Sequence, residues 1–148
     1  MSALRKTELI DDSYFRELGG RAAIERVHVV FYDMLYTHPW LKGFFEGLDK
    51  TRLIAQQTDF MASVLGGPAR FYGREPGPAH CHMFVTEEIF EVRHKLLGEA
   101  MEIAKLAPHV RAPWLKRDYA MKRALVKTSP AECFGRYKTE PIVVVPKP

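Results

Sequence analysis

Three polar side chains in this sequence have the chemistry to hold a metal ion and a small ligand on it. His80 follows a stretch rich in glycine and proline, whereas Tyr32 and Gln57 each interrupt an apolar helical pattern. Neutral imidazole is a common protein ligand for metals. A phenol and a carboxamide can each donate a hydrogen bond. Together the three groups indicate a metal-bound ligand with two donors beside it.

The helix that would position Tyr32 is predicted over residues 21–36. Its apolar side chains recur at steps of three and four residues, the period of one helix face, and they are Ala23, Ile24, Val27, Val30, Phe31, Met34 and Leu35. Tyr32 follows Phe31 on the core-facing side, although a tyrosine at the edge of a core can also reach water. His38-Pro39 ends this helix, and residues 40–45 form a short apolar connector.

Gln57 lies on a second periodic helix, predicted from about Lys50 to Leu65 and ended by two glycines and a proline. The inward face of this helix consists of Leu53, Gln57, Phe60, Met61 and Val64. An unpaired buried carboxamide costs about 1–3 kcal/mol, so Gln57 needs a hydrogen-bond partner inside the fold. Periodicity alone favours a structural partner, such as a backbone carbonyl or another helix, over a ligand.

His80 is preceded by residues 69–79, which are predicted to form an irregular loop because they contain two glycines and two prolines. Taken alone, His80 is better explained as a surface histidine than as a ligand. The run His80-Cys81-His82 lacks a second ligand pair at a standard zinc spacing, so a zinc or copper site is not favoured. The remaining histidines show no clustering and are predicted to be surface or packing residues: His28, His38, His94 and His109.

Two further helices are predicted after His80. Thr86 can cap a long helix that runs to about Ala107 and is ended by Pro108. Another helix is predicted from about Pro113 to Val126. The tail from residue 129 contains four prolines, and its apolar patch at residues 142–145 could dock on the domain or on a partner.

Length and composition favour a single helical domain. The chain has 148 residues, of which 47% are hydrophobic, and a net charge of +4. Its basic residues are scattered among acids, and the densest basic stretch, residues 111–127, has the spacing of an amphipathic helix, so nucleic-acid binding is not favoured. We predict a soluble cytoplasmic protein, because the sequence has neither a signal peptide nor an apolar run of membrane-spanning length. Cys81 and Cys133 are predicted to be free thiols.

The chain closely resembles the truncated haemoglobins, most of all their group 1. The resemblance is carried, in order, by Leu18-Gly19-Gly20, Ala23-Ile24, Phe31-Tyr32, Phe44-Phe45, Leu53-Ile54-Ala55-Gln56-Gln57, Phe60, Val64-Leu65-Gly66-Gly67-Pro68, Tyr72-Gly73, His80, Val85-Thr86 and Phe90. It implies an all-α, two-over-two helical sandwich. We assign residues 1–15 to an N-terminal extension, 16–128 to the globin domain and 129–148 to a proline-containing C-terminal tail.

The resemblance implies haem b as cofactor and a role for each matching residue. His80 falls on the proximal iron ligand, Tyr32 and Gln57 on the distal donors to bound dioxygen, and Phe45 on the phenylalanine that packs against the macrocycle. Leu53 takes the place of the distal histidine of ordinary globins. The remaining distal residues are Phe31, Phe60 and Met61, and the expected partners of the haem propionates are Thr51, Arg52 and Arg74.

The sequence departs from the family at two positions. The family usually has a glycine two or three residues after the proximal histidine, whereas this chain continues Cys81-His82-Met83-Phe84, so His82 remains a rival to His80. Met61 stands where relatives often carry a phenylalanine that lines a gas tunnel. We therefore expect the turn after His80 and the wall of a gas tunnel to differ from those of the family.

Three classes of function fit these residues. One is the binding and transport of dioxygen, with NO and CO as further ligands. The second is a haem enzyme that oxidises nitric oxide or reduces peroxide; the sequence has no flavin or nicotinamide motif, so such an enzyme would need an external reductase. The third is a helical interaction module without haem. The resemblance favours the first two.

Overall fold

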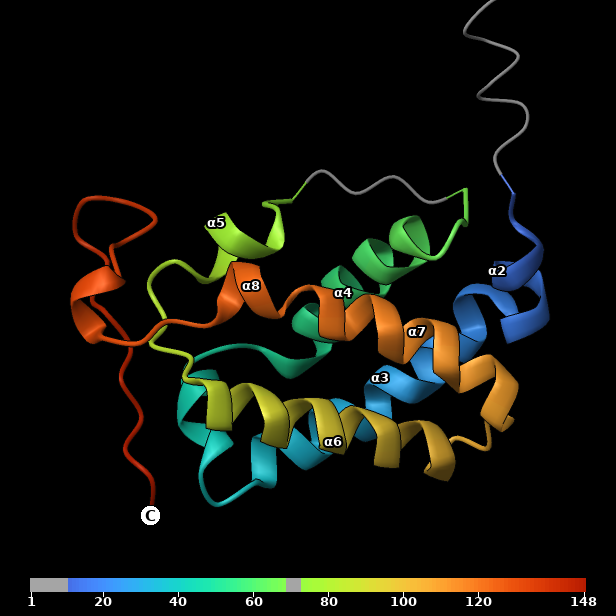
Figure 1. Ribbon diagram of the computed structural model, residues 1–148, viewed down its shortest axis with the longest axis horizontal. Helices are drawn as coiled ribbons and strands as arrows, with labels where there is room; N and C mark the ends of the chain where they lie inside the picture. The colour runs from blue at the N-terminus through green and yellow to red at the C-terminus, as the bar shows by residue number, and fades with distance from the viewer. Residues whose placement is uncertain (1–10, 69–72) are drawn as a thin grey trace, which may run out of the picture.

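The computed structural model describes residues 11–68 and 73–148, and helices dominate them (Figure 1). The α-helices are α2 (Ser13–Leu18), α3 (Gly20–Thr37), α4 (Lys50–Val64), α5 (Pro76–His80), α6 (Glu87–Ile103), α7 (Pro108–Ala120) and α8 (Lys122–Leu125), and the 3-10 helices are η1 (Leu41–Phe45) and η2 (Pro130–Glu132). The only extended pairing in this part of the chain is two isolated parallel bridges, Met83 with Val143 and Val85 with Val126. The all-α prediction is confirmed.

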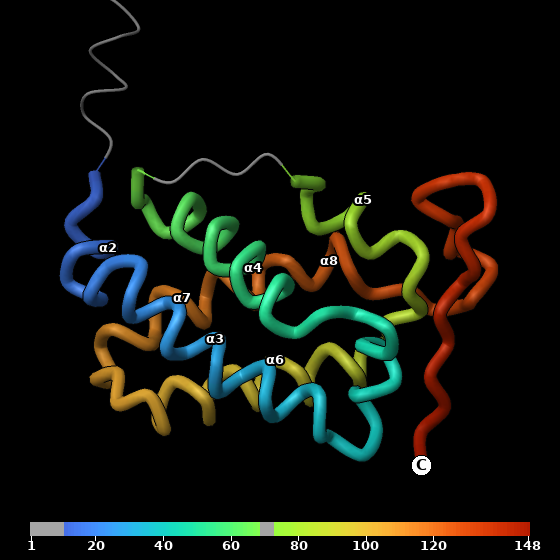
Figure 2. The backbone as a smooth tube through the Cα atoms, turned by 180° about the vertical axis from the view of Figure 1, so that it is seen from behind, coloured from blue at the N-terminus to red at the C-terminus, as the bar shows by residue number. Residues whose placement is uncertain are grey.

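The long helices form two layers. Helices α3 and α4 pack together in one layer, α6 and α7 form the other, and α3 contacts α6 across the boundary (Figures 1 and 2). This is the expected two-over-two arrangement. The largest fully buried side chains of the core are Trp114, Phe90, Ile24, Leu97, Met101, Val27 and Thr58. Helices α5 and α8 contact each other at one end of the sandwich.

The two helices of the first layer agree with their predicted bounds to within one residue. The carboxylate of Asp49 caps α4 by accepting a hydrogen bond from the Arg52 amide at 3.2 Å. Gly66 follows α4 with a φ of 94°, a left-handed conformation that favours glycine. A Cβ on Gly67 would lie 2.6 Å from the Phe15 ring, so these glycines both end the helix and admit α2 close to it.

The predicted bounds of the helices after His80 were wrong. Helix α6 ends at Ile103, and Lys105 turns the chain with a φ of 65°. Pro108 begins α7 instead of ending α6, because the first residue of a helix needs no free N–H. Pro113 lies inside α7, and the predicted single helix is divided at Met121, where α7 gives way to α8.

The predicted loop before His80 was also partly wrong. Residues 69–72 lie outside the described part of the chain. Residues Pro76–His80 form the short helix α5, in which Pro76 takes the first position and the Ala79 amide donates to the Glu75 carbonyl at 2.8 Å. Prolines near a helix start are compatible with helical backbone, so this composition does not distinguish a loop from one helical turn.

The C-terminal tail folds back onto the turn that follows His80. The Phe134 amide donates to the Cys81 carbonyl at 3.0 Å, and Val143 exchanges two backbone hydrogen bonds of 2.8 Å with His82 and Phe84. The Val145 carbonyl accepts from Trp40 Nε1 at 3.2 Å. The apolar patch at 142–145 therefore docks on the domain itself, one of its two predicted positions.

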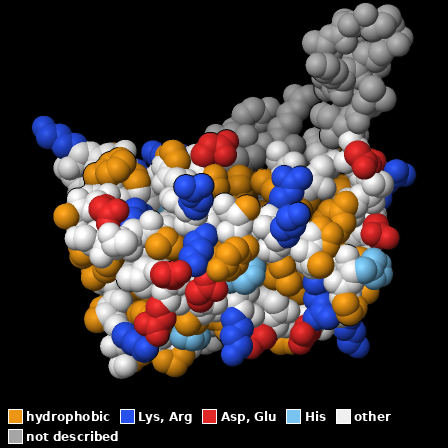
Figure 3. Space-filling view, viewed as in Figure 1, with side chains coloured by type: hydrophobic (Ala, Val, Ile, Leu, Met, Phe, Trp, Pro, Cys, Tyr) orange, Lys and Arg blue, Asp and Glu red, His pale blue; other side chains and the backbone are white. Residues whose placement is uncertain are grey.

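Charged side chains of both signs are mixed over the face formed by α6, α7 and α8 (Figure 3). Lys122 in the basic stretch pairs with Glu87 at 2.8 Å and with Glu91 at 2.9 Å. This agrees with a solvated helix face and gives no continuous basic patch on this side. None of the helices in residues 11–68 and 73–148 combines the length and the apolar character that crossing a membrane requires.

Candidate functional site

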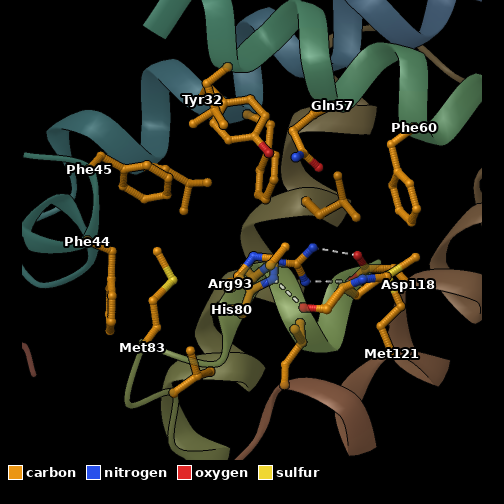
Figure 4. Close-up of a pocket in the computed structure, with 18 of the residues that line it drawn as sticks. Tyr32, Phe44, Phe45, Gln57, Phe60, His80, Met83, Arg93, Asp118 and Met121 are labelled. Carbon is orange, nitrogen blue, oxygen red and sulfur yellow. Dashed lines mark hydrogen bonds and ion pairs between the residues drawn. The ribbon is translucent and has the colours of Figure 1, made fainter. Parts of the chain in front are cut away.

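A largely apolar cavity lies between the two layers and is closed on one side by α5 (Figure 4). About 1190 Å³ of empty space lies in the cavity and in the open solvent at its mouth. The apolar residues that line it include Phe31, Leu35, Phe44, Phe45, Leu53, Phe60, Met61, Met83, Ile89 and Leu97. A space of this kind suits a large, flat, mostly apolar ligand.

His80, the last residue of α5, lines this cavity with its imidazole held in one tautomer. Its Nδ1 lies 2.7 Å from the Pro76 carbonyl oxygen. Because a carbonyl oxygen can only accept, Nδ1 carries the hydrogen, and the lone pair is on Nε2. Burial lowers the pKa of His80 to about 4, so the ring is neutral near pH 7. Such an imidazole can bind a metal without first losing a proton.

Lys127 fixes the backbone around His80. Its ammonium donates to the carbonyl oxygens of His80 at 2.9 Å, of Met83 at 2.8 Å and of Leu125 at 3.3 Å. Its own amide donates to the Val85 carbonyl at 2.8 Å. The turn that carries the imidazole is therefore bound by a charged donor to the segment after α8.

Tyr32 and Gln57 point into the same cavity from α3 and α4 (Figure 4). Within residues 11–68 and 73–148, neither side chain has a hydrogen-bond partner. The Tyr32 ring is held by edge contacts with Phe31 at 5.1 Å and Phe45 at 6.1 Å between centroids. Burial raises the pKa of Tyr32, which keeps the hydroxyl protonated as a donor. The structural partner that periodicity favoured for Gln57 is not found in the described chain.

The structure brings most of the remaining predicted site residues to the cavity. Phe31, Phe45, Leu53, Phe60, Met61 and Arg74 all line it. Thr51 and Arg52 do not; they lie exposed on the first turn of α4.

His82 lies outside the cavity. Its side chain is buried beneath the tail, where Nε2 is 3.9 Å from a Glu140 carboxylate oxygen. Burial lowers the pKa of His82. The two histidines of the His80-Cys81-His82 run therefore face different surroundings, and His80 is the one that reaches the cavity.

Sequence reasoning missed three polar residues in the cavity wall. His28 is buried, and its Nδ1 lies 2.9 Å from Thr58 Oγ1. Arg93 lines the cavity from α6, and its guanidinium donates to both carboxylate oxygens of Asp118, at 2.9 and 2.6 Å. Asp118 also lies 2.7 Å from His94 Nδ1. Although burial alone would raise it, these neighbours hold the pKa of Asp118 well below its usual value.

The positions of Arg93 and Asp118 within their helices could have indicated from the sequence that both charges are buried. Arg93 lies four residues after Ile89 and four before Leu97, both of which are buried. Asp118 lies four residues after the buried Trp114. A charge in the middle of each apolar stripe indicates a buried ion pair in the same way that Gln57 indicates a buried donor.

Comparison with known proteins places these features in a family. The chain matches the sequence model of the Bacterial-like globin family over residues 13–126. It is 33% identical over 112 residues to a group 1 truncated hemoglobin of Tetrahymena pyriformis, covering 68% of this chain and 93% of the relative. It is 31% identical over 104 residues to one of Mycolicibacterium paratuberculosis, covering 70% and 75%.

Solved structures agree in fold. The truncated hemoglobin of T. pyriformis in its Fe(III) form matches with a TM-score of 0.72 and 23% identity, covering 78% of this chain and 98% of that one. A Synechococcus 2/2 hemoglobin in the cyanomet state, with covalently attached heme, matches with a TM-score of 0.68 and 22% identity, covering 75% and 94%.

A two-over-two helical sandwich around an imidazole-bearing apolar cavity defines a haem globin. The chain belongs to the bacterial-like globin family and, within it, to the group 1 truncated haemoglobins. The resemblance described from the sequence is confirmed, and the cofactor of this family is haem.

Proposed function

We propose that this protein binds dioxygen, and other diatomic gases such as NO and CO, at a haem iron held by His80. Haem would supply the iron and a coordination position for the gas. One observation carries the proposal: His80, Tyr32 and Gln57 line the same apolar cavity, and neither Tyr32 nor Gln57 has a hydrogen-bond partner among the residues that the structure describes.

His80 would hold the iron through Nε2. Its Nδ1–H is already donated to the Pro76 carbonyl, which fixes the ring orientation and makes Nε2 a stronger electron donor. Lys127 holds the backbone on which the imidazole is carried. The position of the ligand atom is therefore set before haem arrives.

Tyr32 and Gln57 would donate hydrogen bonds to the bound gas. A gas that takes up negative charge from the iron would be a strong acceptor for both donors, because a hydrogen bond to a charged acceptor contributes about 1.5–3 kcal/mol. Both donors lack another partner in the described chain, so neither must break a bond within that chain to reach the ligand. The apolar lining keeps competing water away.

Arg74, exposed at the edge of the cavity, is a candidate partner for a haem propionate. Thr51 and Arg52 are less suited to that role because neither reaches the cavity wall.

The role of the two donors can be tested by oxygen dissociation from the ferrous protein. Each of the variants Tyr32→Phe and Gln57→Leu is expected to raise the dissociation rate of oxygen by roughly tenfold or more, because each removes one charge-assisted hydrogen bond. The dissociation rate of CO, which gathers far less charge, is expected to change much less. Unchanged oxygen rates in both variants would reject this role.

The ligand assignment has its own test. His80→Gly is expected to lose the Soret spectrum of imidazole-ligated haem, and added imidazole is expected to restore it. Retention of the wild-type spectrum by the variant would refute ligation by His80. Rapid catalytic loss of NO with an external reductant would identify an enzyme and not a carrier.

A further inference from the structure

A cation lines the cavity in addition to the two neutral donors. The guanidinium carbon of Arg93 lies 5.7 Å from the centroid of the Phe31 ring and 5.5 Å from that of Phe90. Arg93 lines the same cavity as His80, Tyr32 and Gln57, and its ion pair with Asp118 is drawn in Figure 4. Burying a charge is costly, so a cation among aromatic rings needs an explanation.

Asp118 compensates part of the positive charge of Arg93. The two residues form a bidentate pair, and the Asp118 side chain is only 3% exposed. His94 Nδ1 lies 2.7 Å from the Oδ2 atom of the same carboxylate. Asp118 is thus a positioning residue: it fixes the plane of the guanidinium and keeps the charge in the cavity wall.

The pair leaves donors unused. A guanidinium carries five N–H groups, and the bidentate pair occupies two of them. No other hydrogen bond to Arg93 occurs within residues 11–68 and 73–148. The Arg93 side chain remains 27% exposed, and because it lines the cavity, that surface offers donors to whatever occupies it. Arg93 and Asp118 both line the cavity, so the unpaired N–H groups of the guanidinium lie in the cavity wall next to the carboxylate that holds it.

We propose that Arg93 is an anion-recognition group that hydrogen-bonds to small anions bound at the haem iron, such as azide or nitrite. This inference rests on the proposed function, because it requires haem in the cavity. Tyr32 and Gln57 are neutral donors suited to diatomic gases, whereas a fixed guanidinium adds full charge in a site of low dielectric. The pocket would then hold small anions as well as gases.

The carboxylates of the haem itself are the second possible anion. Propionates need a place at the mouth of the cavity, where the exposed Arg74 lies. Arg93 comes instead from the inward stripe of α6, beside the fully buried Phe90. Because Arg93 lies deep in the cavity, an anion bound to the metal is a better partner for it than a propionate at the edge of the cofactor.

The test is equilibrium binding of azide and nitrite to the haem-loaded ferric protein. Arg93→Met is expected to raise the Kd for both anions by roughly ten- to a hundredfold, the loss expected for a hydrogen bond to a charged group. The Kd for CO on the ferrous protein, a neutral ligand, should change by less than about threefold. The matched control is Lys95→Met, which removes one positive charge from the exposed face of the same helix and should leave the anion Kd unchanged.

A double variant and a haem-transfer measurement separate the role of Arg93 from its other possible effects. Arg93→Met leaves the Asp118 carboxylate buried without its cation, so Arg93→Met/Asp118→Asn is measured beside it and should show the same loss of anion affinity. Haem transfer to an excess of apomyoglobin reports propionate contacts. Faster haem loss with wild-type azide affinity would place Arg93 on a propionate and overturn the inference. Equal losses for azide and CO would also overturn it.

The same spectra separate the two proposals. If the wild-type protein lacked the spectrum of imidazole-ligated haem, the proposed function would be refuted. If Arg93→Met kept the haem spectrum and the wild-type anion affinity, only the inference about Arg93 would be refuted.

Discussion

His28 is expected to make this protein lose stability in mild acid. The imidazole is 3% exposed, pairs with Thr58 Oγ1 at 2.9 Å, and lies 5.7 Å from the ring centroids of both Tyr32 and Trp114. Burial lowers the pKa of His28 from 6.5 to about 3; the charge on Arg93 adds to this effect, and Asp118 opposes it. The folded protein therefore holds this ring neutral at pH values where an unfolded chain would protonate it.

The sign and size of the effect follow from proton linkage. Above pH 6.5 the ring is neutral in both states, so it causes no pH dependence there. As the pH falls below 6.5, the unfolded chain binds a proton that the folded chain does not, and stability falls until the pH approaches 3. Between pH 7 and pH 5 the loss from this one residue is about 2 kcal/mol.

The assay is urea unfolding of the haem-loaded protein at pH 7, 6 and 5, comparing wild type with His28→Phe. Phenylalanine keeps a ring among the neighbouring aromatic side chains but does not titrate. The variant should lose about 2 kcal/mol less than wild type between pH 7 and pH 5. The comparison cancels effects common to both proteins, including those of His80. His109→Gln, at an exposed position, controls for the loss of one imidazole. Parallel pH dependences in wild type and His28→Phe would refute the reasoning.

Two further predictions concern the segment after α8. Lys127→Met should lower the free energy of unfolding by at least about 2 kcal/mol and speed haem loss, because it removes the charged donor to the His80 carbonyl and its neighbours. The control is Lys116→Met, at an exposed position. Equal haem-loss rates in the two variants would contradict the role of Lys127. Deleting residues 129–148 should leave a chain that still binds haem but is less stable by about 2 kcal/mol or more, since the partly buried valines of the tail are lost. Deleting only 146–148 removes an exposed ion pair and should cost less than about 1 kcal/mol, measured by the same urea unfolding. Similar stabilities for the two deletions would show that the tail does not support the domain.

The helices of the first layer could be predicted closely because two independent signals agreed. Apolar periodicity defined the inward faces of α3 and α4, and Gly66-Gly67-Pro68 marked where α4 ends. From the segment before His80 onward the signals conflicted. Proline can precede, start or follow a helix, so Pro76, Pro108 and Pro113 could not be assigned from sequence alone.

The candidate site was only partly visible in the sequence. Tyr32, Gln57 and His80 stood out as polar groups in apolar or irregular surroundings, and the structure brings all three to one cavity. Arg93 and Asp118 each interrupt an apolar stripe, which marks a buried charge, but they are 25 residues apart on different helices, so the spacing does not identify the partner of either one. Only the packing of α6 against α7 shows that they form a pair.

The return of the tail to the turn after His80 has a consequence for synthesis on the ribosome. Met83 and Val143 are bridged, although 60 residues separate them in the chain. A nascent chain that has just exposed α5 therefore lacks the backbone partners of this turn, and it acquires them only when residues near 143 leave the exit tunnel. Contacts of such long range form late and slowly. Haem that binds before then would bind next to a turn whose backbone hydrogen bonds to the tail have not yet formed.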